Sequence, residues 1–107
     1  MLEALIQNYE LVARMQLAAG KVLDVSEESA ETRRMYGLDD KPTARYGLRC
    51  LMARRMVESG VRFVQVFPDV NNGNSQVWDS HKDVKSENEA CFAFADKPTA
   101  ALITDLK

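Results

Sequence analysis

The stretch "ARYGLRCLMARRMVESGVRFVQVF", residues 44–67, decides the fold that this sequence predicts. Its first part has apolar residues at helical spacing and follows Pro42, which favours a helix start, so we expect a helix over residues 42–59. Its second part, "VRFVQVF", alternates and is rich in β-branched and aromatic residues directly after Gly60. This pattern is typical of a strand over residues 61–67.

The predicted strand carries apolar residues on both faces, which indicates a largely buried, parallel strand. A helix, a glycine turn and a buried strand form half of an α/β unit. One strand cannot satisfy its own backbone groups, so its partners come either from the remainder of a parent domain or from a second chain. The sequence therefore predicts an α/β fold in which residues 1–107 are a mostly helical segment of a larger α/β domain.

The rest of the chain is predicted to be mainly helical. Three further segments show the apolar period of helices: residues 2–19, 27–35 and 82–106. Gly20 is expected to end the first of them and Ser26 to cap the second. Pro98 is expected to kink or divide the third, because proline lacks a backbone donor.

Composition narrows the classes of function. The 107 residues, 46% of them hydrophobic, suffice for one unit with its own core. Fourteen Lys and Arg against sixteen Asp and Glu give a net charge of −2, which argues against nucleic-acid binding. The arginines of the predicted helix 42–59 are interpreted as a solvated face with ion pairs. No apolar run reaches the about 18 residues that a membrane span needs.

The two cysteines and the first residues of the chain say little about the cellular compartment of the protein. Cys50 and Cys91 lie in apolar helical patterns without Cys-x-x-Cys spacing, so we expect buried free thiols in place of a disulfide or a zinc site. The start "MLEALIQNYELV" lacks the basic and apolar regions of a signal peptide. The chain itself carries no targeting signal.

The segment "WDSH", residues 78–81, contains the only Trp and the only His of the chain. It follows the predicted strand and the polar loop "PDVNNGNSQ", in the position where open α/β sheets present ligand-binding residues. A carboxylate and an imidazole two residues apart, Asp79 and His81, can bind one divalent ion. The alternative is that Asp79 or Ser80 caps the following helix and that His81 is a surface side chain.

A series of motifs along the whole chain resembles the later-middle portion of DUF1501 proteins, a family of sulfatase-like proteins in the alkaline-phosphatase-like superfamily. The series is "NYELVARMQ", "VLDVSEESAETRRMYGLDD", "PTARYGLRCLMARRMVESGVRFVQVF", "WDSHKDVKSENE" and "DKPTAALITDLK". Its most specific parts are R-R-x-Y-G, G-V-R-F-V and W-D-x-H. Many members of this family are exported.

The resemblance implies a larger α/β/α domain that hydrolyses small-molecule sulfate or phosphate esters with divalent metals. It maps Asp79 and His81 onto metal ligands and implies no catalytic residue in this chain. The sulfatase nucleophile motif, Cys or Ser followed by x-P-x-R, is absent, and there is no second histidine. We therefore expect residues 1–107 to be inactive alone. The competing hypothesis is a non-enzymatic helical interaction module.

Overall fold

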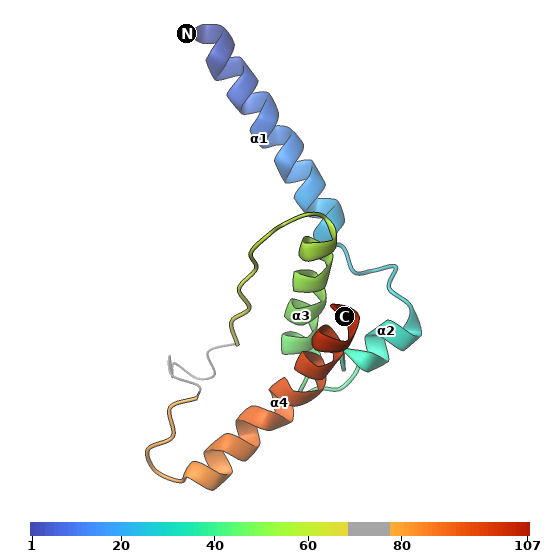
Figure 1. The fold of residues 1–107 in the computed structure, drawn as a ribbon, viewed down its shortest axis with the longest axis vertical. Helices are drawn as coiled ribbons and strands as arrows, with labels where there is room; N and C mark the ends of the chain where they lie inside the picture. The colour runs from blue at the N-terminus through green and yellow to red at the C-terminus, as the bar shows by residue number, and fades with distance from the viewer. Residues whose placement is uncertain (69–77) are drawn as a thin grey trace.

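The computed structural model describes residues 1–68 and 78–107. In these residues the chain forms helices only (Figure 1). Their bounds are α1 Leu2–Leu23, α2 Ala30–Met35, α3 Ala44–Glu58 and α4 Val84–Asp105. The radius of gyration is 17.6 Å, above the ~13 Å of a compact chain of about 100 residues. Figure 1 shows the reason: α1 projects as an arm from a small body formed by α2, α3 and α4.

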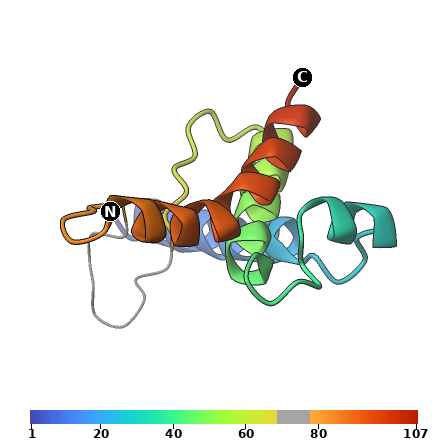
Figure 2. The same ribbon diagram turned by 90° about the horizontal axis from the view of Figure 1, so that it is seen from below.

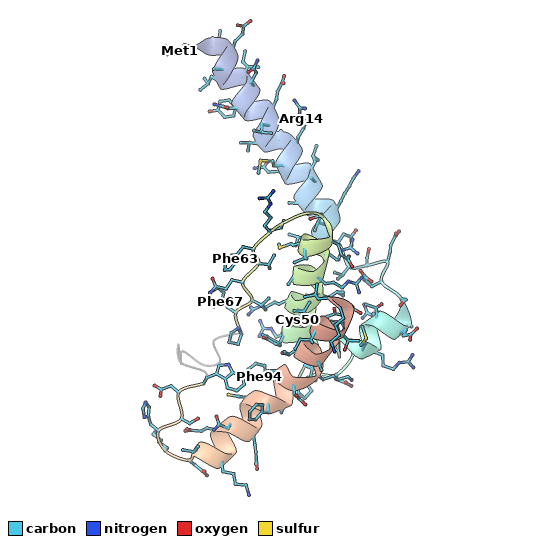
Figure 3. The ribbon with its side chains drawn as sticks, viewed as in Figure 1. Met1, Arg14, Cys50, Phe63, Phe67 and Phe94 are labelled. Atoms are coloured by element: carbon cyan, nitrogen blue, oxygen red, sulfur yellow. The ribbon has the colours of Figure 1, made fainter. Side chains whose placement is uncertain are left out.

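The core lies where α3 meets the C-terminal part of α4 and the end of α2. It consists of Tyr36, Cys50, Leu51 and Ala101, all buried. Figure 3 shows Cys50 on the part of α3 that faces α4. Both cysteines are buried free thiols, which confirms the prediction for Cys50 and Cys91.

Polar contacts at the edge of the core join all three helices of the body. The hydroxyl of Tyr36, at the end of α2, donates a 2.8 Å hydrogen bond to Asp105 of α4. The guanidinium of Arg54 on α3 donates to the same carboxylate oxygen at 2.9 Å. On the next residue, Arg55 pairs with Glu28 at 2.6 Å. The expected ion pairs of the arginine-rich helix are therefore present for Arg54 and Arg55.

A tight turn connects α2 to α3. Gly37 has a φ of 66°, in the left-handed region that favours glycine. Thr43 is buried, and its hydroxyl donates to the carbonyl oxygen of Gly37 at 2.6 Å. This bond fixes the start of α3 two residues after the predicted residue 42.

Two predicted helix ends were wrong. The first helix continues through Gly20 to Leu23, because nothing at residue 20 interrupts its backbone hydrogen bonds. The second helix begins at Ala30 with Ser29 as its cap: the side chain of Ser29 accepts a 3.1 Å hydrogen bond from the Thr32 amide. The amide of Ser26 instead donates to the side chain of Asp24, so this serine belongs to a turn.

The predicted α/β fold, with a buried strand at residues 61–67, is wrong for the described part of the chain. Val61 donates to the carbonyl of Met56, but residues 62–67 make no backbone–backbone hydrogen bond with any other described residue. The segment runs back along α3, and the labelled Phe63 and Phe67 lie on it (Figure 3). Both are exposed. A strand requires a paired neighbour, and the described chain provides none.

The proline of the last helix does not divide it. Pro98 lies inside the continuous helix α4 and is buried in the core. Figure 2 shows that α4 changes direction along its length, as expected when a proline removes one backbone hydrogen bond and crowds the preceding turn.

Gly47 gives a first test of the packing. A methyl group at this position would lie 2.1 Å from the carbonyl oxygen of Tyr36, whereas nothing lies within 4 Å of the same position on Gly20. Gly47→Ala should lower the free energy of unfolding by about 2 kcal/mol, because backbone atoms must shift. Gly20→Ala should cause no loss, since alanine is the better helix former by about 1 kcal/mol. Urea unfolding of both variants checks this, and equal stability of the two would contradict the packing described.

Cys50 gives a second test. Burial raises the pKa of its thiol to about 11 from 9.0. The raised pKa means that the neutral thiol stabilises the fold fully below pH 9, and that this contribution is lost as the pH rises toward 11. The loss should be about 2 kcal/mol. Denaturant unfolding between pH 8 and 11 should show that the free energy of unfolding falls less with pH in Cys50→Ala than in the wild type. The variant is less stable than the wild type at every pH.

Candidate metal-binding pair

The loop before α4 leaves Asp79 and Ser80 without a capping role. The cap is Asp83, whose side chain accepts a 3.3 Å hydrogen bond from the amide of Ser86. Hydrogen bonds from Ser86 lower the pKa of the Asp83 carboxyl. The alternative interpretation is therefore wrong about the cap at Asp79 or Ser80 and right that His81 is a surface side chain. Helix α4 begins at Val84, two residues later than expected.

Aromatic contacts attach this loop to the body. The ring of Trp78 meets that of Phe92 edge-on at 5.6 Å and lies 6.0 Å from that of Phe94. Phe94 in turn meets Tyr46 of α3 edge-on at 5.5 Å. A hydrogen bond of 3.3 Å from Ser80 to Asn88 adds a polar contact. The loop is thus held against α4, and the aromatic contacts continue to α3.

Asp79 and His81 face each other at the outer side of the loop. The Nε2 atom of His81 lies 2.5 Å from Oδ1 of Asp79. The His81 side chain is 79% exposed and that of Asp79 is 37% exposed, so both are open to further groups. At this distance the two atoms are hydrogen-bonded and no ion fits between them. Once that proton is released, a carboxylate oxygen and a ring nitrogen are donors of the types that zinc and related divalent ions accept.

The number of donors is too small for a complete site. Within residues 1–68 and 78–107, no three His, Cys, Asp or Glu side chains are grouped so that they could hold an ion. Most of the predicted polar loop "PDVNNGNSQ" lies outside the described residues. The donor types fit a divalent ion, but the described chain provides two ligands at most.

A groove on the body lies elsewhere. It has a volume of about 540 Å³ and is bordered by Met52 and Met56 of α3 and by Val64 and Val66 of the extended segment. Arg49 lies at its edge and donates a 2.7 Å hydrogen bond to the carbonyl oxygen of Phe67. Neither Asp79 nor His81 lines this groove. Its mostly apolar surface offers no chemistry related to the pair.

Sequence comparison identifies the family. The DUF1501 profile, described as "Protein of unknown function (DUF1501)", matches residues 1–107, and the chain belongs to this family. No curated protein and no solved structure matches the chain. In the part of the chain that the structure describes, no helix is long and apolar enough to cross a membrane.

Sequence reasoning singled out Asp79 and His81 and favoured Trp78 as the residue that packs their loop, but it missed the partners of Trp78. Phe92 and Phe94 belong to "CFAFA" in the predicted helix 82–106, and the helical pattern assigned them no role. Two phenylalanines on either side of a small residue in that helix were the available signal. It gave no indication that their partner would be Trp78.

Trp78 is the only tryptophan, so its fluorescence reports on this loop directly. We expect Phe92→Ala to shift its emission to longer wavelength and to lower its anisotropy, because an edge contact worth about 0.5–1.5 kcal/mol is lost. Phe63→Ala is the control, since Phe63 is 80% exposed and lies on the extended segment. Identical spectra for the two variants would show that the Phe92 contact does not hold the loop.

Proposed function

We propose that this chain contributes Asp79 and His81 to the metal centre of a sulfatase-like hydrolase that acts on sulfate or phosphate esters. The observation that carries the proposal is that the exposed side chains of Asp79 and His81 lie together in a loop whose helix is capped by another residue. A bound metal would replace the hydrogen bond between His81 Nε2 and Asp79 Oδ1. Membership of DUF1501 supports the family but names no activity. The remaining ligands and the nucleophile come from outside the described residues.

The roles of the two side chains follow from their chemistry. Asp79 offers negative charge to balance a cation, and His81 offers a neutral nitrogen when its ring is deprotonated. Trp78 and Ser80 hold the loop through Phe92 and Asn88. A divalent metal bound there supplies charge neutralisation at the ester and lowers the pKa of a bound water or alcohol.

The cysteines do not serve as nucleophiles in this proposal. Cys50 and Cys91 are both buried, and burial raises the pKa of the Cys50 thiol to about 11. A reactive cysteine needs an accessible thiolate. This agrees with the absence of the sulfatase nucleophile motif around either residue.

The test is metal analysis of the protein as its cells produce it, purified without chelator. Asp79→Asn and His81→Gln should each lower the bound divalent metal at least about tenfold, because each removes a ligand from the ion. Asp96→Asn is the matched control, since Asp96 is an exposed carboxylate on α4. It should retain the wild-type metal content.

Unchanged metal content in both pair variants would refute the proposed centre. If the metal is lost as expected, hydrolysis of an aryl sulfate and an aryl phosphate by the wild type and the control distinguishes the two substrate classes. Both pair variants should then lose activity on whichever ester is cleaved. A metal-containing protein that cleaves neither ester would contradict the hydrolase assignment and leave only the metal site.

A further inference from the structure

Helix α1 stands apart from the body along nearly all of its length. Every residue from 1 to 20 is exposed. The helix is attached at its end, where Arg55 donates to the carbonyl oxygens of Val22 at 2.6 Å and Lys21 at 3.1 Å. Figure 3 shows Met1 and Arg14 along the arm, away from the body. At 22 residues, the arm is about 33 Å long.

The exposed arm carries an apolar stripe. Its large members are Leu2, Leu5, Ile6, Tyr9 and Val12, spaced as one side of a helix requires. Leu2 is 72% exposed and Tyr9 is 70% exposed. A contiguous apolar surface of this kind marks an interaction site. The stripe continues toward the base of the arm with small residues, Ala13, Ala19 and Gly20.

The charges of the arm indicate which partner fits. Its charged side chains are Glu3, Glu10, Arg14 and Lys21. They are separated by seven, four and seven residues, so they follow one line beside the stripe. Acids occupy the outer half of that line and bases the inner half. A second copy of the helix in the opposite direction places acid against base, whereas a copy in the same direction, related by a two-fold axis along the helices, has its charged line on the opposite side of the pair, where no charges meet.

We propose that α1 pairs with α1 of a second copy of this chain in antiparallel orientation, centred near Val12. In that register Glu3 lies opposite Lys21 of the second copy, and Glu10 lies opposite its Arg14. A two-fold axis at the centre keeps the charged lines on the same side of the pair, where they face each other. In the same register Leu5 lies opposite Ala19 and Ile6 opposite Ala18 of the second copy, and Tyr9 lies opposite the exposed Met15.

The two features of the arm have different effects on the pair. Burial of the apolar stripe supplies the affinity, at ~25 cal/mol for each Å² removed from water. The ion pairs are exposed and contribute little energy, but only the antiparallel arrangement forms them. The interface involves none of the residues of the proposed metal centre.

Sedimentation equilibrium of the chain with single substitutions tests the interface. Ile6→Glu places a charge in the stripe and should raise the dimer dissociation constant at least about tenfold. Gln7→Glu introduces the same side chain on the neighbouring, polar side and should change it less than about threefold. Both residues are exposed in the single chain, so circular dichroism should show unchanged helix content. A wild type that stays monomeric, or equal effects of the two variants, would overturn the proposal.

Charge reversal at low salt tests the orientation. Glu3→Lys with Glu10→Lys should weaken the dimer about threefold to tenfold, because base then faces base. Adding Arg14→Glu and Lys21→Glu should restore the wild-type affinity in an antiparallel pair. In a parallel pair the two charged lines lie on opposite sides in all three proteins, so affinities that do not differ would exclude the antiparallel arrangement.

Discussion

The carboxylate of Asp105 is the point on which the body depends. It is on the last residue of α4, and it receives both the Tyr36 hydroxyl from the end of α2 and the Arg54 guanidinium from α3. Tyr36 is completely buried, so its hydroxyl needs this acceptor. With this contact in place, Leu51 and Cys50 are enclosed on the inner side of α3. The same helix positions Arg55, which binds the base of α1.

The helices of this fold could be predicted because the backbone hydrogen bonds of a helix join residues that are close in sequence. Apolar spacing and capping residues located all four helices within a few residues, and only their ends were misplaced, as at Gly20 and Ser26. Residues 61–67 show the opposite case. Their composition favours a strand, but a strand depends on a partner that no pattern within the segment specifies. The α/β prediction was wrong for this reason.

The candidate site also has features that the sequence predicts and features that only the structure shows. Asp79 and His81 were recognisable because the chain has one histidine and because a carboxylate lies two residues before it. Their mutual contact and the absence of a capping role are consequences of the three-dimensional structure. Trp78 lies in a loop, whereas Phe92 and Phe94 lie in a helix. Helical periodicity describes the helix alone, so it cannot predict which loop residue contacts these two rings. Donor types can be read from a sequence, whereas donor geometry cannot.

The direction change of α4 has a further consequence. Ala101 and Asp105, which meet the core and Tyr36, follow Pro98, whereas Trp78 and its loop attach before it, at Phe92 and Phe94. The buried Cys91 and Ala95 also precede Pro98, so the half of α4 that holds the loop is itself packed into the body. The position of the loop is therefore tied to the core: a substitution at Cys91 or Ala95 alters both the packing and the placement of the loop, whereas one at the exposed Phe92 alters the loop alone.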